Sequence, residues 1–287
     1  MFLPLRRLIL RAALLLAAPG TVFAQGDHAA ASDNSSFWTR WIRRSERNKA
    51  EQPHWLTPIA TTTPRLEQEL RYDIDWSQAR PGMPYTTTFG NTKGLELIPF
   101  DDVEIIFGIP SYVAHGDPAV SDGWGDAQLL VKYRLLAADQ AHGDYILTVF
   151  LSSSFPTATE GNGQPRAIVT PTVAYGKGWG DFDIQGTLGV TEPVGSTSAI
   201  GRTYIWNHTF QFHALEKVWP ELEVNQAWFS GGRNDGKSQT FLTPGVVIGR
   251  LPVTEAVGLT VGVGVQIAVS AFHTANHNYI LSLRAPF

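Results

Sequence analysis

Residues 65–76 read RLEQELRYDIDW and alternate between two kinds of side chain. The set that runs from Leu66 to Trp76 is mostly apolar or aromatic, whereas the set that runs from Arg65 to Asp75 is charged throughout. Successive side chains of a β-strand point to opposite faces, so this pattern predicts a strand with one apolar and one charged face. A soluble sandwich and a membrane barrel would both give it, and the rest of the chain decides between them.

The alternation recurs along the chain and predicts about twelve antiparallel strands. They are expected over residues 64–76, 87–98, 103–112, 124–136, 144–155, 167–177, 181–191, 202–214, 221–229, 239–250, 256–270 and 278–287. Many reach the roughly 9–11 residues that a tilted strand needs to cross a bilayer. The connections alternate between short ones and longer ones rich in Gly, Pro, Ser, Thr and Asn, as expected of periplasmic turns and outer loops. The sequence therefore predicts an all-β fold, a transmembrane antiparallel up-and-down β-barrel with both termini on the periplasmic side.

One predicted strand has an unusual second face. From Val257 to Val269, Val, Leu and Ile alternate with mostly small residues, among them Gly258, Gly262 and Gly264. Small residues in a strand leave room for a close neighbour, so this face is expected to be crowded.

The first 24 residues have the order of a secretory signal peptide. Arg6, Arg7 and Arg11 precede or open the apolar run 8–18, and Ala24 supplies a small-residue cleavage site. A run this short does not span about 30 Å of hydrocarbon as a helix, which favours a cleaved peptide over a membrane anchor. We therefore expect a signal peptide, a periplasmic segment and an outer-membrane barrel over residues 1–24, 25–63 and 64–287.

Composition narrows the functional classes. The chain has no cysteine, which excludes disulfides and thiolate metal sites. Its formal net charge is −4, and removal of the three signal-peptide arginines would make it −7. Such an acidic mature chain gives no support to nucleic-acid binding.

Residues 37–49 differ from the segments on either side. They combine four large apolar residues with five basic ones, namely Phe37, Trp38, Trp41 and Ile42 with Arg40, Arg43, Arg44, Arg47 and Lys49. Three interpretations stay open: a plug for an acidic lumen, a segment on the periplasmic membrane face, or a flexible tether. The prolines at 53, 58 and 64 predict that the following residues are extended or irregular.

Charged residues on the polar face of the predicted strands are expected to line the lumen. The candidates are Arg65, Glu67, Glu69, Arg71, Asp73, Asp75, Glu104, Asp126, Lys132, Arg134, Asp181, Asp183, Glu221 and Glu223. They would make either a polar pore with a preference for cations or a filled lumen in which opposite charges pair. A barrel of about twelve strands is intermediate in width between filled barrels and open porins, so both interpretations remain.

The carboxyl-terminal end carries a short pattern of its own. Tyr279, Leu281, Leu283 and Ala285 alternate down to the terminal Phe287. This resembles the signature that outer-membrane barrels present to their assembly machinery, which we therefore expect as a partner during biogenesis.

Motifs in the middle of the chain resemble a narrower group. Gly123-Trp124-Gly125-Asp126 opens one strand that ends in Lys132-Tyr133-Arg134, Ser154-Phe155-Pro156-Thr157 closes the next, and Gly178-Trp179-Gly180-Asp181 opens another. These are similar to motifs of the putative meta-pathway phenol-degradation family of outer-membrane proteins, although Ala158 stands where that family has Gly. The resemblance implies a barrel that takes up small, often aromatic, compounds.

The leading hypothesis is a passive channel or transporter for small, possibly aromatic or hydrophobic, solutes in the outer-membrane lipid. The alternatives are a lipid-modifying enzyme and a non-conducting structural barrel. For the enzyme, the candidate side chains are His208, His213, His273 and His277 with Ser270 and Ser282. We expect no catalytic residues, no metal site and no cofactor, because no nucleophile motif or metal-ligand spacing is present.

Overall fold

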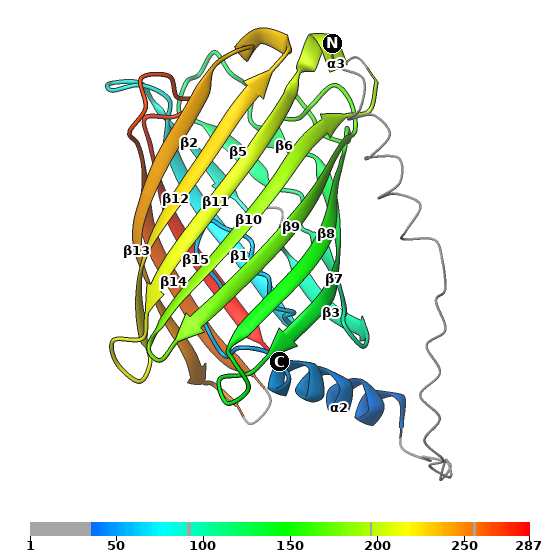
Figure 1. Cartoon of the computed structure of the whole chain (residues 1–287). Coiled ribbons are helices and arrows are strands. Elements are labelled where there is room, and N and C mark those ends of the chain that lie inside the picture. Colours follow the sequence, from blue (N-terminus) through cyan, green and yellow to red (C-terminus); the bar gives the residue numbers. More distant parts are fainter. Residues whose placement is uncertain (1–35, 91–92, 196, 255–256) are drawn as a thin grey trace, which may run out of the picture. The chain divides into compact units, whose positions relative to one another are not determined.

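The computed structural model of the chain describes residues 36–287, with the exception of 91–92, 196 and 255–256. The signal peptide expected at residues 1–24 lies outside the described residues. No helix in the described part of the chain is long and apolar enough to cross a membrane. Residues 37–287 form one compact unit, a barrel with one helix at its end (Figure 1).

The elements follow one another almost entirely as antiparallel neighbours. They are α2 (Phe37–Ala50), β1 (Glu69–Gln78), β2 (Tyr85–Phe89), β3 (Leu95–Phe100), β4 (Val103–Gly108), β5 (Tyr112–His115), β6 (Gly123–Trp124), β7 (Ala127–Ala138), β8 (Tyr145–Phe155), β9 (Ile168–Trp179), β10 (Phe182–Pro193), α3 (Thr197–Ile200), β11 (Arg202–Phe212), β12 (Val218–Ser230), the 3-10 turn η1 (Gly232–Asn234), β13 (Ser238–Pro252), β14 (Gly258–Ala268) and β15 (His277–Pro286). The last strand pairs with the first, from Glu69 opposite Pro286 to Gln78 opposite His277, and closes the sheet.

These pieces make twelve wall strands. β2 pairs with one half of β1 and β3 with the other, so β2 and β3 are two parts of one wall strand. β4 and β5 likewise form the next wall strand, and β6 and β7 the one after it. The prediction of a closed antiparallel barrel of about twelve strands is confirmed.

The two faces of the wall are the reverse of those in a soluble protein. Arg71, Lys132 and Glu223 point inward and are fully buried, whereas Val173, Leu188 and other large apolar side chains on the outer face are exposed. A polar interior and an apolar exterior suit a barrel that is surrounded by lipid.

The two ends of the barrel differ in their connections. At one end, here called the turn end, the strands are joined by residues 101–102, 139–144, 180–181, 213–217 and 253–257. At the other, the loop end, they are joined by residues 79–84, 116–122, 156–167, 194–201, 231–237 and 269–276. The α2 helix and Phe287 both lie at the turn end (Figure 1).

The amino-terminal boundaries differ from the prediction. The first strand begins at Glu69 rather than Pro64, and residues 37–50 form the helix α2 rather than a tether. Residues 64–67 continue the period-two pattern of β1, but they lie inside the barrel and outside the wall strands. Gln68 marks the transition, because its carbonyl accepts a hydrogen bond from the Phe287 amide at 3.1 Å. The barrel wall therefore does not begin at residue 64, where the domain boundary was expected.

Three neighbouring wall strands are interrupted at similar positions along the barrel. The breaks fall at residues 90–94, at 109–111 and at 125–126. Pro110 has no backbone N–H to donate to a ladder, and Gly90 has a φ of 81°, which favours glycine. The break at 90–94 turns Lys93 into the lumen, where its Nζ reaches the carbonyls of Ala60 and Thr61 at 3.1 and 3.2 Å.

A glycine on the outer face seats an aromatic ring. Gly186 of β10 is paired with Tyr175 of β9 and His208 of β11. The Tyr175 ring lies over Gly186 so closely that a Cβ at position 186 would be 2.6 Å from its Cζ. The Tyr175 hydroxyl then lies 3.3 Å from His208 Nδ1 and accepts a hydrogen bond from Trp206 Nε1 at 3.3 Å.

Gly186→Ala should therefore destabilise the barrel, because the new methyl group displaces the Tyr175 ring and its hydrogen bonds. We expect a loss of about 1–3 kcal/mol in the free energy of unfolding, typical of overpacking, measured by urea titration in lipid vesicles. In a Tyr175→Ala background the same substitution should have little effect. An equal loss in both backgrounds would contradict this account of the packing.

Candidate functional site: the plugged lumen

The segment that follows α2 occupies the lumen. Residues 52–68, here called the plug, include eleven buried residues: Gln52, Trp55, Leu56, Thr57, Ile59, Thr61, Thr63, Arg65, Leu66, Glu67 and Gln68. In Figure 1 the blue chain after α2 loops inside the wall before it joins β1. No plug residue takes part in the sheet of the described barrel. Its backbone N–H and C=O groups are thus buried without a ladder, and they need other partners.

Two carboxylates of β12 accept the plug's backbone amides. Ile59 N donates to Glu221 at 2.9 Å, and the amides of Ala60 and Thr61 each donate to Glu223 at 2.6 Å. Ionised acceptors make stronger hydrogen bonds than neutral ones. These contacts join positions more than 160 residues apart in the sequence.

Cations of the wall donate to the plug's carbonyls. Arg284 binds the carbonyls of Thr57 and Pro58, and Arg71 binds those of Pro58 and Ile59. Further donors from the wall are Lys93 to Ala60 and Thr61, Lys132 to Arg65, Gln185 to Leu56, Thr148 to Pro64 and Arg250 to Trp55. The backbone dipoles of the plug thus replace water around buried charges, which would otherwise be expensive to bury.

The plug's apolar side chains fit against glycines of the wall. A Cβ at Gly176 would lie 2.4 Å from the Trp55 ring, and one at Gly245 would lie 2.5 Å from Ile59 Cδ1. Leu56 approaches Gly249 in the same way, and Ile59 also lies against Gly262 and Gly264. The small-residue face of residues 257–269, which was predicted to be crowded, is therefore the surface on which Ile59 packs.

Ion pairs complete the filling of the lumen. Arg71 pairs with Asp73 at 2.8 Å, Lys132 with Glu104 at 2.9 Å, and Arg65 with Glu67 at 3.0 Å, all with nearly inaccessible side chains. The filled-lumen interpretation thus describes this state, and an open pore with a cation preference does not.

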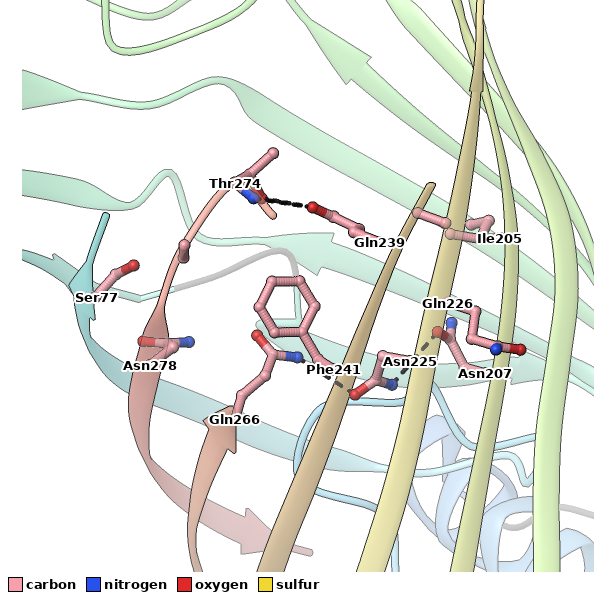
Figure 2. A pocket seen from close by; sticks show the side chains of 12 residues that line it. Ser77, Ile205, Asn207, Asn225, Gln226, Gln239, Phe241, Gln266, Thr274 and Asn278 are labelled. Atoms are coloured by element: carbon pink, nitrogen blue, oxygen red, sulfur yellow. Dashed lines mark hydrogen bonds between the residues drawn. The ribbon is translucent and has the colours of Figure 1, made fainter. Parts of the chain in front are cut away.

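A cavity of about 260 Å³ lies on the loop-end side of the plug and is here called the vestibule. Its polar lining consists of amides and hydroxyls without a charged side chain, and includes Ser77, Asn207, Asn225, Gln239, Gln266, Thr274 and Asn278 (Figure 2). Asn225 links it to the plug, because its Nδ2 donates to Thr61 Oγ1 at 3.2 Å. Gln266 Nε2 in turn donates to Asn225 Oδ1 at 3.3 Å.

A second cavity, of about 420 Å³, lies at the turn end. Trp55, Asp183 and Trp219 line it from within the barrel, with His54 beside them. Burial, with Arg65 and Arg250 nearby, lowers the pKa of His54, so that its imidazole is neutral near pH 7. Plug residues 55–61 lie between this cavity and the vestibule, and they separate the lumen into two chambers.

The residues predicted to line the lumen fall into four groups. Inward-facing and buried in the wall are Glu69, Arg71, Asp73, Glu104, Lys132, Arg134, Asp183, Glu221 and Glu223, with Asp75 half-buried on the same face. Arg65 and Glu67 belong to the plug. Asp126 binds the loop-end amides of Thr157, Ala158 and Gln164. Asp181 is exposed in a two-residue turn at the rim of the turn-end cavity, so its predicted place on the inner face of a wall strand is wrong.

Several lumen residues were not predicted. Arg284, Gln185 and Gln211 are fully buried and alternate with outward-facing apolar residues, so the period-two pattern could have identified them. The inward position of Lys93 could not be predicted from the alternation, because the break in its wall strand sets the direction of its side chain.

The assembly signature lies on β15 and at the chain end, with Tyr279, Leu283 and Phe287 exposed and Leu281 half-buried.

The side chains considered for catalysis do not form a nucleophile–base pair. Ser270 Oγ donates to the carbonyl of Phe272 at 2.7 Å, while His273 Nδ1 lies 3.0 Å from the carbonyl of Ser270. His208 is held by Tyr175, and His213 stacks on Trp219. Across the described residues, no three His, Asp or Glu side chains are grouped as they would be around a metal ion.

Solved structures with the same fold are outer-membrane barrels. The NanC porin aligns with a TM-score of 0.51 at 11% identity over 75% of this chain and 98% of that chain. OmpT of Vibrio cholerae aligns with a TM-score of 0.39 at 8% identity over 76% of this chain and 96% of that chain. No protein-family model and no curated protein sequence matches the chain, so the resemblance to the phenol-degradation family is not supported. The likeness to the NanC porin identifies the fold, a closed antiparallel β-barrel of the kind that porins have.

The Glu223 carboxylate should control how tightly the plug is held. Glu223→Ala leaves the amides of Ala60 and Thr61 without their acceptor, and each buried unpaired amide costs about 1–3 kcal/mol. With Thr61→Cys as the single thiol of a cysteine-free chain, Glu223→Ala should speed maleimide labelling at position 61 by roughly tenfold or more.

The matched control is Glu216→Gln, which changes an exposed carboxylate in the turn before β12. It should leave the labelling rate unchanged. Equal rates in the Glu223→Ala and Glu216→Gln proteins would show that Glu223 does not hold the plug.

Proposed function

We propose that the protein is an outer-membrane channel for small solutes and that the structure is its closed state. The observation that carries this proposal is the division of the lumen into two chambers by a plug that is not part of the wall. Removal of the plug would join the vestibule to the turn-end cavity.

The way the plug is held supports a movable closure. Its polar contacts run between its backbone and wall side chains such as Glu223 and Arg284, and water can replace each of them. The wall closes by pairing β1 with β15 and does not use residues 52–67, so this part of the plug can leave without breaking the barrel's hydrogen-bonded closure. Proteins use segments of this kind, of low intrinsic stability, for gating.

The vestibule supports a preference for uncharged solutes. Its amide side chains both donate and accept hydrogen bonds, which suits hydroxyl, amide or carbonyl groups on a solute. Phe241 and Ile205 add apolar contact area, which a small aromatic compound could also use. In this proposal the solute is selected in the vestibule before it meets the charged groups around the plug.

The membrane placement follows from the asymmetry of the connections. Short turns face the periplasm and long loops face outward in barrels of this kind, so the vestibule would open to the outside. The NanC protein is named a porin, which is consistent with passage of solutes through this fold. Delivery through a signal peptide and recognition of the Phe287 end by assembly machinery belong to the same proposal.

A disulfide between plug and wall tests the channel directly. The double variant Ile59→Cys with Gly245→Cys places two thiols close together, because a Cβ added at Gly245 would lie 2.5 Å from Ile59 Cδ1. The chain has no other cysteine. In planar bilayers the reduced protein should show conductance steps, and oxidation should abolish them.

The Ile59→Cys single variant is the control, since oxidation has no second thiol to join and should leave its steps unchanged. Glu221→Ala with Glu223→Ala should raise the open fraction. Silence of the correctly folded reduced protein would contradict the proposal and favour a non-conducting barrel. Equal conductance before and after oxidation would show that the plug does not close the channel.

A further inference from the structure

The α2 helix has one side fixed to the barrel. Trp41 Nε1 donates to Gln68 Oε1 at 2.7 Å, and Lys49 Nζ donates to the Phe287 carbonyl at 3.1 Å. Arg47 pairs with Asp101 at 2.7 Å, and Asn48 Oδ1 accepts the Asp102 amide at 3.1 Å. The hydrogen bond from Arg47 holds the pKa of Asp101 below its usual value, so the carboxylate is ionised at neutral pH. The helix is therefore held beneath the turn end of the wall.

An adjacent side of α2 is apolar and exposed. Trp38 is 70% exposed, Phe37 55% and Ile42 53%. Residues four apart lie on the same side of a helix, so Trp38 and Ile42 form one apolar edge. A cluster of large exposed apolar side chains on a surface segment usually marks a contact with a partner or a membrane.

The position of this edge indicates a membrane. The amino-terminal end of α2 extends beyond the outline of the barrel in Figure 1, on the side of β3. Phe100, the last residue of β3, is 65% exposed. Trp179 and Phe212 are exposed at the same end of the barrel, where their strands finish. Aromatic side chains at strand ends mark the level of the lipid headgroups.

The charge of α2 indicates which lipid. Its fourteen residues contain five basic and one acidic side chain. A short amphipathic helix with Arg and Lys on its polar side and Trp and Ile on the other binds in the interface of membranes that contain anionic lipids.

We propose that α2 binds the headgroup region of the inner leaflet of the outer membrane, with Trp38 and Ile42 inserted and with anionic phospholipid as its partner. The inference rests on the membrane placement given under the proposed function. Because α2 ends at Ala50 and the buried plug begins at Gln52, lipid contact holds the amino-terminal end of the plug at the membrane surface.

Spin labels on single cysteines of the full mature chain test the proposal. Labels at Trp38→Cys and Ile42→Cys are compared with one at Glu216→Cys, an exposed turn residue at the same end of the barrel, in vesicles of phosphatidylglycerol with phosphatidylcholine. We expect labels 38 and 42 to collide more with oxygen than with a water-soluble nickel chelate, and label 216 to show the opposite. A label at Leu188→Cys on the outer face reports whether the barrel is in the bilayer.

Lipid composition tests the partner. Pure phosphatidylcholine, or Arg40→Gln with Arg43→Gln in the mixed vesicles, should reduce the oxygen preference at 38 and 42 several-fold. Labels 38 and 42 as water-exposed as label 216, with label 188 in lipid, would overturn the proposal while leaving the barrel's placement intact. Equal insertion in both lipids would overturn the anionic partner, and a water-exposed label 188 would overturn the membrane placement itself.

Discussion

The arrangement of the lumen depends on one exchange of hydrogen bonds, between the backbone of the plug and the carboxyl, ammonium and guanidinium groups of the wall. A segment with no ladder of its own is buried, and so are charges such as Arg71, Arg284 and Glu223. Neither could be buried alone, because an unpaired amide or charge in an interior costs several kcal/mol. Together they satisfy each other, since carboxylates accept the amides of residues 59–61 and cations donate to the carbonyls of residues 57–61.

This exchange explains the composition of the barrel's inner face. Charged residues line the level of the plug, whereas amides and hydroxyls line the vestibule beyond Thr61. Glycines of β9, β13 and β14 leave room for Trp55 and Ile59. The plug is therefore complementary to the wall in both shape and hydrogen-bonding groups. Its contacts with α2 at the turn end connect it to the part of the chain that we expect to touch lipid.

Local patterns predicted the wall well and the plug poorly, for a physical reason. Strands are long and alternate locally, so the number of strands and their faces follow from residues such as those of 65–76 and 257–269. Residues 65–68 continue the same alternation while they lie in the plug, and so the start of the first strand could not be seen. The partners of the plug, Glu221 and Arg284, are more than 160 positions away. The crowded glycine face showed that something packs there, but only the folded chain shows that it is Ile59.

Amide hydrogen exchange of the refolded mature protein in lipid bilayers tests the central claim most directly. If the wall's charges hold the plug's backbone, the amides of Ile59, Ala60 and Thr61 should exchange far more slowly than those of an unstructured peptide, but faster than those of the strands, because the plug can open while the wall stays folded. Protection should also be lost together across these three residues when the pairing is disturbed. Exchange of residues 59–61 at the rate of a free peptide, in a barrel whose strands remain protected, would contradict the account.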